Sequence, residues 1–295
     1  MIVRKKTFAA VFAAALLVLS LCGALAEDTV SLYGKNYPLN ARKIDFGSTA
    51  VTDLQPLLDA LPLFTQLEEV DLYESKLTVE DMQKLYTAAP QLHWGLSLEM
   101  AAHHIRSDIE SFSTLHSPRA VLYPSELYYP IRFCWRLKAL DLGHNKITTL
   151  DFLENLTELR YLILAVNRID DISLLANLTK LEYLEIDDND YISDLSPLAS
   201  CRNLMDLNIA TMKKVKDVSV VLELPNLRRM WFSSSKNQMP ERKAIQEELE
   251  SRGVKVVMNP YYFAVGSGWR EDPHYDVIYE TFNTYTFVPF EDSKQ

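Results

Sequence analysis

The side chains of this chain that could do chemistry are carboxylates, aromatic rings and a few histidines, and their spacing indicates binding rather than catalysis. Asp187 and Asp188 are adjacent, so on an extended segment they point to different sides and do not form an acid–base pair. The run Asp188-Asn189-Asp190 lacks the glycine and glutamate of a calcium loop. The remaining candidates match no zinc spacing: His103, His104, His116 and Cys134. We therefore expect no catalytic residue, no metal site and no cofactor.

The elements that must position any binding residue are set by leucines that recur at a fixed interval. One spacing, L-x-x-L-x-L-x-x-N-x-I, begins at Leu137 and returns at Leu159 and Leu181, with degraded copies from Leu204 and Leu227. Self-similarity with a period of 22 residues indicates a solenoid built one supersecondary unit at a time. Such folds present extended binding surfaces.

Each position of the repeat has a physical role. The aliphatic residues point inward from a short strand, and the residues between them point outward. The asparagine ends the strand, where its amide can satisfy backbone groups of the sharp turn. Asp171, Asp194 and Asp217 precede an apolar return segment of period three, which favours a 3₁₀ helix or irregular turn over a full helix.

These units resemble the internalin-type leucine-rich repeat of bacterial surface and secreted proteins, over roughly Leu137 to Phe232. The wider arrangement, with an earlier unit at 67–94 and Gly268-Trp269-Arg270 near the end, is similar to a group of secreted bacterial leucine-rich repeat proteins without established activity. The resemblance implies an α/β fold: a leucine-rich repeat solenoid with a curved parallel sheet on its concave face. Its convex face would carry 3₁₀ or irregular turns and short helices, with helical caps at the ends.

The N-terminus has the pattern of a secretory signal peptide. Three basic residues precede the apolar run 8–21, and the small-x-small triplet that ends at Ala26 fits a cleavage site. Cleavage there leaves 27 basic against 40 acidic residues and a net charge of −13, which disfavours nucleic acid as a partner. We expect a secreted or cell-surface protein without a membrane span after cleavage. A lipoprotein anchored through Cys22 is the disfavoured alternative, because the bulky Leu21 precedes it.

The flanks of the array predict caps and divergent repeats. We divide the chain into a signal peptide (1–26), an N-terminal cap with a first half repeat (27–66), divergent repeats with an irregular insertion (67–136), regular repeats (137–235), and a C-terminal cap with an aromatic tail (236–295). The frame is lost over 99–136, which fits either an insertion or two irregular units. The aromatic segment 269–290 is expected to fold back as part of the C-terminal cap, and a partner-binding role is the alternative.

The two remaining cysteines are expected to be free. Cys134 and Cys201 occupy the same column three repeats apart, which at about 4.8 Å per repeat places them about 14 Å apart. A disulfide needs Cα atoms within roughly 7 Å. We interpret both as small buried core residues.

The outward strand positions supply the predicted binding surface, because they form the concave face of the sheet. They combine aromatic rings with charges, as protein interfaces do: Tyr73, Asp141, Tyr161, Tyr183, Glu185, Asp187, Asp206, Arg229 and Trp231. We expect a non-enzymatic module that binds a protein ligand through this face. Glycan binding, with tyrosine and tryptophan stacked on sugar rings, and a cell-envelope scaffold without a specific ligand are the alternatives.

Overall fold

The leucine columns of the repeats stack in register as a parallel sheet of seven strands. The order is β8 (Ser111–Ser113), β9 (Ala139–Asp141), β10 (Tyr161–Ile163), β11 (Tyr183–Glu185), β12 (Asp206–Ile209), β13 (Arg229–Phe232) and β14 (Lys255–Val257). Leu140, Leu162, Leu184, Leu207 and Met230 face one another across the ladder, and all are fully buried. The predicted 22-residue frame is therefore confirmed.

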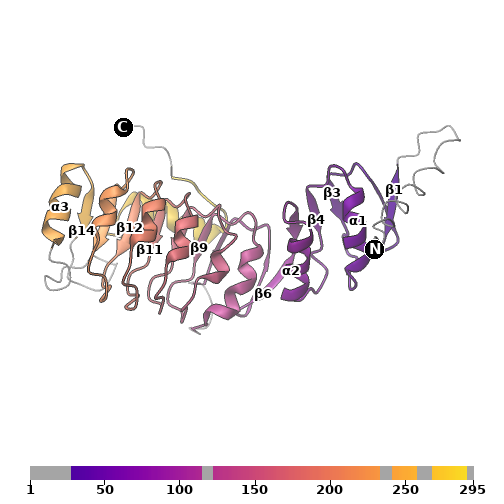
Figure 1. Cartoon of the computed structure of the whole chain (residues 1–295), viewed down its shortest axis with the longest axis horizontal. Coiled ribbons are helices and arrows are strands. Elements are labelled where there is room, and N and C mark those ends of the chain that lie inside the picture. Colours follow the sequence, from indigo (N-terminus) through magenta and orange to yellow (C-terminus); the bar gives the residue numbers. More distant parts are fainter. Residues whose placement is uncertain (1–27, 115–121, 233–240, 258–267, 291–295) are drawn as a thin grey trace, which may run out of the picture.

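The computed structural model describes residues 28–114, 122–232, 241–257 and 268–290. The expected signal peptide, Cys22 and His116 lie outside these residues. Successive elements follow one another along an elongated molecule, and the C-terminal segment runs back along the array (Figure 1). Within the described residues, no helix is both long enough and apolar enough to cross a membrane.

The return segments are short helices on the convex side, as the period-three pattern predicts. They are the 3₁₀ helices η3 (Asp151–Leu153), η4 (Ser173–Asn177), η5 (Ser196–Ser200) and η6 (Ser219–Glu223). Asp171, Asp194 and Asp217 each accept a hydrogen bond from the backbone N–H two residues later, at 2.7–2.8 Å. This local turn competes with a longer helix and fixes where each return begins.

The repeat asparagines satisfy the buried turns, also as predicted. The Asn167 amide donates to the carbonyls of Leu142 and Leu164, and its oxygen accepts from the N–H of Ile147. Asn145 and Asn189 occupy the same column in the neighbouring repeats. Just before them, His144, Val166 and Asp188 adopt positive φ angles of 53–58°, so the sharp turn is repeated at every level.

A second parallel sheet starts the solenoid. It contains β3 (Lys43–Asp45), β4 (Glu69–Asp71) and β5 (His93–Gly95), with Ile44, Val70 and Trp94 in register. A separate antiparallel hairpin of β1 (Thr29–Leu32) and β2 (Lys35–Pro38) precedes this sheet. The convex side carries α1 (Gln55–Ala60), η1 (Leu61–Leu63) and α2 (Val79–Ala88). Thr78 caps α2 in a capping box with Asp81.

The region where the frame is lost contains both an insertion and an irregular unit. An antiparallel hairpin of β6 (Ser97–Met100) and β7 (His103–Arg106) separates the two parallel sheets. The unit that follows places Phe112 in the leucine column, opposite Leu140, and returns through the 3₁₀ helix η2 (Ser125–Phe133). Cys134 and Cys201 are free and buried, as the column spacing predicts.

The last elements differ in part from the expectation. Helix α3 (Arg242–Ser251) packs beside β14 at the end of the array, where a cap is expected. Helix α4 (Pro273–Thr284) instead contacts β8 and β9, which lie at the opposite end of the seven-stranded sheet. The aromatic tail therefore covers the concave face rather than the open end of the core.

Candidate functional site

Two rows of outward side chains cross the seven-stranded sheet. Ladder register places Tyr161, Tyr183, Asp206, Arg229 and Lys255 in the first row. The second row contains Asp141, Ile163, Glu185, Asn208, Trp231 and Val257. Strand alternation explains the pattern, because these positions lie on either side of the leucine column. The concave face is thus a continuous strip of rings and charges.

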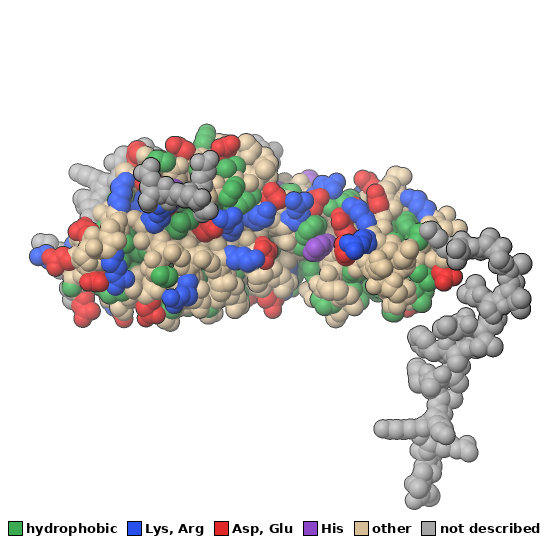
Figure 2. All heavy atoms as spheres, turned by 90° about the horizontal axis from the view of Figure 1, so that it is seen from above, with side chains coloured by type: hydrophobic (Ala, Val, Ile, Leu, Met, Phe, Trp, Pro, Cys, Tyr) green, Lys and Arg blue, Asp and Glu red, His purple; other side chains and the backbone are tan. Residues whose placement is uncertain are grey.

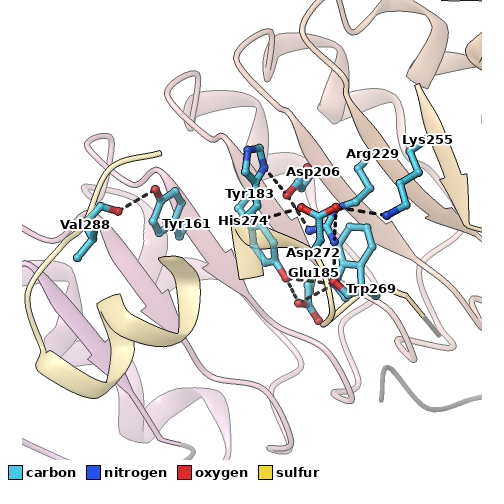
Figure 3. Close-up of polar contacts among 10 residues, drawn as sticks. All are labelled: Tyr161, Tyr183, Glu185, Asp206, Arg229, Lys255, Trp269, Asp272, His274 and Val288. Carbon is cyan, nitrogen blue, oxygen red and sulfur yellow. Dashed lines mark hydrogen bonds and ion pairs between the residues drawn. The ribbon is translucent and has the colours of Figure 1, made fainter. Parts of the chain in front are cut away.

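The chain's own C-terminal segment covers this strip. We call residues 268–290 the tail segment. Trp269, Ile278, Phe282 and Phe290 pack with Tyr161, Tyr183 and Trp231 in one buried apolar cluster. Figure 3 shows α4 and the adjoining chain lying over the strands that carry the two rows. As a result, Tyr161, Tyr183, Glu185, Asp206, Arg229 and Trp231 are each at most 2% exposed.

Trp269 occupies the centre of the contact. Its indole N–H lies 3.0 Å from Glu185 Oε1 and 3.1 Å from the Tyr183 hydroxyl. The Tyr183 hydroxyl also donates to Glu185. The Trp269 ring lies 6.0 Å from the Tyr183 ring and 6.3 Å from the Trp231 ring, measured between centroids. The concave face therefore contacts both the ring of Trp269 and its N–H donor.

A buried charge cluster lies beside the indole. The Arg229 guanidinium stacks 3.9 Å from the Trp269 ring centroid, donates to the Trp269 carbonyl, and pairs with Asp206 at 2.8 Å. Asp272 lies 3.7 Å from Arg229 and 3.4 Å from Lys255. Burial acts to raise the pKa of Asp272, but these cations and the His274 N–H outweigh it and lower the pKa below its usual value. His274 Nδ1 lies 3.0 Å from Asp206 Oδ2. The first row thus holds both the backbone and a side chain of the tail segment.

The far end of the tail segment packs on tyrosine. The Tyr161 hydroxyl donates to the Val288 carbonyl at 2.9 Å. Phe287 and Phe290 lie 4.9 and 4.7 Å from the Tyr161 ring centroid. The Arg160 guanidinium stands 4.9 Å from the centroid of the Phe287 ring. These contacts are the aromatic and cation–π contacts that protein interfaces use.

A group of carboxylates lies under the tail near Arg270. Burial raises the pKa of Asp141 to about 6, although the Gly143 N–H and the Ser113 hydroxyl bond its oxygens. Burial, and then the charge of Glu185, raise the pKa of Asp187 well above its usual range. Arg270 lowers the pKa of both groups. Burial thus disfavours the charged forms of these two carboxyl groups, and the charge of Arg270 offsets part of that effect.

The sequence-predicted residues fall into two groups. Asp141, Tyr161, Tyr183, Glu185, Asp187, Asp206, Arg229 and Trp231 lie on or beside the two rows. Tyr73 lies on the other sheet, where the Arg106 guanidinium stacks 3.5 Å from its ring centroid and Gly95 leaves room for the ring. The structure therefore does not bring Tyr73 together with the rest. That these residues bind a ligand stays a prediction.

Sequence reasoning did not place the residues that cover the face. The missed partners are Trp269, Arg270, His274, Phe287 and Phe290. Their aromatic content marked the segment as unusual, but neither period nor spacing connects Trp269 with Tyr183, 86 residues away. Within the described residues, no group of three or more histidine, cysteine or acidic side chains is arranged to hold a metal.

The surface also has grooves away from the concave face. Two grooves of about 610 and 570 Å³ share Val79, Glu99, His104 and Pro130, and they adjoin the β6–β7 hairpin between the two sheets. Figure 2 shows Lys, Arg, Asp and Glu side chains interspersed along the visible surface, without a broad area of one sign. The excess of acidic residues is thus distributed rather than gathered on that side.

The repeat geometry defines the chain as a leucine-rich repeat protein. A family profile described as "Leucine Rich repeats (2 copies)" matches residues 157–200, which span the repeats that begin at Leu159 and Leu181. No curated protein matches the chain. Parallel strands, 3₁₀ returns and the asparagine column together are the leucine-rich repeat solenoid.

Solved structures similar to the chain include bacterial leucine-rich repeat proteins. Internalin C2 of Listeria monocytogenes is 23% identical, with 78% of this chain and 87% of that chain covered and a TM-score of 0.40. A leucine-rich repeat protein of Leptospira interrogans is 16% identical, with 77% and 57% covered and a TM-score of 0.37. Another Listeria monocytogenes internalin is 24% identical, with 47% and 49% covered and a TM-score of 0.34.

Asp141 should make stability depend on pH. Its folded pKa of about 6 lies above its ordinary value of 3.8, so the folded state binds more protons than the unfolded state between these values. The free energy of unfolding should therefore fall as pH rises from about 4 to 6, and the loss should persist at pH 7. Asp141→Asn should raise the free energy of unfolding at pH 7 by about 2 kcal/mol, with the gain vanishing below pH 4, as measured by urea unfolding.

Asp217→Asn is the matched control. The backbone N–H and hydroxyl of Ser219 lower the pKa of the exposed Asp217, so its charged form is favoured in the folded state and its substitution should not stabilise the protein at pH 7. Equal gains from both substitutions would contradict the assignment to Asp141.

Proposed function

We propose that the protein is a secreted, non-enzymatic module that binds a protein partner through the concave face of its repeat array. One observation carries the proposal: this face already seats a polypeptide segment, residues 268–290. The seat uses aromatic packing, a buried ion pair and hydrogen bonds to the backbone at Trp269 and Val288. A partner segment offers the same groups.

The composition of the face supports a protein ligand. Binding energy in protein interfaces concentrates in tryptophan, tyrosine and arginine at well-packed central positions. Such positions are occupied by Tyr161 on β10, Tyr183 on β11, and Arg229 and Trp231 on β13. The intervening strand β12 supplies Asp206. A leucine-rich repeat array presents them as a rigid row. The face therefore has anchors for a partner that displaces the tail segment.

Affinity capture from cell-surface and host fractions tests this function. The bait is the parent chain, compared with W269A/F290A, which loosens the tail, and with the same chain carrying Tyr161→Ala and Tyr183→Ala. We expect W269A/F290A to retain a protein partner at least tenfold more than the parent, and the added alanines to abolish retention. Circular dichroism checks that each variant is folded.

Tyr191→Ala is the control, because Tyr191 is 51% exposed and lies outside the two rows; it should change nothing. Capture of a purified polysaccharide with the same dependence on Tyr161 and Tyr183 would favour glycan binding instead. Equal association with cells for every variant would favour a scaffold without a specific ligand. Either outcome contradicts protein binding by the concave face.

A further inference from the structure

The tail segment packs on the concave face as a bound peptide would. Its contacts therefore indicate the chemistry that the face recognises. At Trp269 the face contacts three separate groups: the ring, the indole N–H and the backbone carbonyl. Two rows supply these contacts, Glu185 and Trp231 from one and Tyr183 and Arg229 from the other. Fixing a side chain and its own carbonyl together sets both the position and the chain direction of the bound segment.

The next residue, Arg270, has its guanidinium 5.2 Å from the centroid of the Tyr275 ring of the same segment, so the contacts that define recognition by the face are those of Trp269.

The tail segment fits this face incompletely. Four buried polar atoms under or beside it have no hydrogen-bond partner in the described protein: Asp187 Oδ1, Asp206 Oδ1, Asn208 Nδ2 and Trp231 Nε1. By contrast, the buried carbonyls of the turns that follow these strands accept hydrogen bonds from the repeat asparagines. A buried polar group without a partner destabilises the contact that buries it. Opening is therefore expected at the tail before the leucine core, and a segment that satisfied these atoms would bind more tightly.

We propose that residues 268–290 are an internal competitor of the partner, and that the partner inserts an indole into the place that Trp269 occupies. This inference rests on the proposed function. It commits to a segment of another protein as the occupant. The tail of a second copy of this chain is the competing occupant, which the same experiment detects.

The test uses a fluorescein-labelled peptide of residues 268–290 and the full chain as receptor, with binding followed by fluorescence anisotropy. The parent and W269A/F290A are compared. W269A/F290A leaves all residues of the two rows intact while it weakens the internal competitor. We expect the peptide to bind W269A/F290A at least tenfold more tightly than the parent, and to lose at least tenfold in affinity when the peptide carries W269A.

A milder pair of variants keeps the test decisive if W269A/F290A does not fold. W269F in the receptor keeps an aromatic ring but removes the N–H donor, and should still increase peptide affinity over the parent. Glu185→Gln added to W269F should reduce the effect of W269A in the peptide, because an amide oxygen is a weaker acceptor for the indole N–H than the carboxylate. Equal affinity of the peptide for parent and W269F, or indifference to W269A in the peptide, would overturn the proposal.

Light scattering separates the two occupants. A stable dimer of the parent that W269A/F290A abolishes would show that the tail segment of a second copy is the occupant.

The inference and the proposed function fail in distinguishable ways. Capture of a partner that depends on Tyr161 and Tyr183, together with a peptide that does not bind, overturns the competitor alone. A peptide that binds as expected, together with no capture by any variant, leaves the competitor standing and overturns the proposed function.

Discussion

Replacing Asn189 with alanine is expected to lower the free energy of unfolding by about 3 kcal/mol, because several buried backbone groups lose their partner at once. The Asn189 amide donates to the carbonyls of Leu164 and Ile186 at 3.0 Å, and its oxygen accepts from the Ile169 N–H at 3.1 Å. Asn189 is fully buried, so water cannot easily replace these bonds. Urea unfolding followed by circular dichroism measures the loss.

Asn203→Ala is the matched control for this prediction. Asn203 is exposed and donates to one exposed carbonyl, that of Thr179, at 2.8 Å. Its loss should cost less than about 0.5 kcal/mol, since water can bond the freed carbonyl. If the two substitutions destabilised the protein equally, the asparagine column would not be what closes the turns.

The repeat core could be predicted because several local signals agree on one register. The leucine period, the asparagine position and the aspartate before each return all recur together, as at Leu162, Asn167 and Asp171. Each is a local consequence of strand alternation and turn chemistry. The ladder then follows, since only one register aligns Leu140, Leu162 and Leu184.

The junction between the two sheets could not be predicted in this way. Phe112 occupies the leucine column of β8, but its unit is 28 residues long, as its alignment with Leu140 requires. The preceding hairpin pairs Ser97 with Arg106 and Met100 with His103, which follows no solenoid period. The first of these units differs from the others in length, and the hairpin differs in strand direction. The 22-residue period therefore cannot be recognised in this part of the sequence.

The outward rows could be predicted, but not what covers them. Alternation places Tyr161, Tyr183 and Trp231 on the concave face whatever the tail does. Docking of Trp269 depends on contacts across long sequence separations, such as Tyr161 with Val288, 127 residues apart. Composition alone indicated an aromatic segment that needed burial. It did not tell an end cap from a concave-face contact, because both would bury the same rings.

Arg229→Met is expected to lower the free energy of unfolding by about 3–5 kcal/mol, because it leaves the Asp206 carboxylate buried without its main cation. Arg229 and Asp206 face each other on adjacent strands, and their side chains are 3% and 1% exposed. The same substitution removes the donor to the Trp269 carbonyl, so the tail segment should also become more sensitive to protease. Urea unfolding and limited proteolysis measure the two effects.

A double substitution distinguishes an unpaired charge from simple loss of packing. Asp206→Asn combined with Arg229→Met removes both charges and should recover at least half of the loss, because the penalty comes mainly from the isolated carboxylate. Lys180→Met is the surface control: Lys180 lies 2.6 Å from Glu158, but both side chains are about half exposed, so about 0.5 kcal/mol or less is expected. If the double variant were as unstable as Arg229→Met alone, packing of the guanidinium against Trp269, rather than charge pairing, would be what holds the tail segment on the sheet.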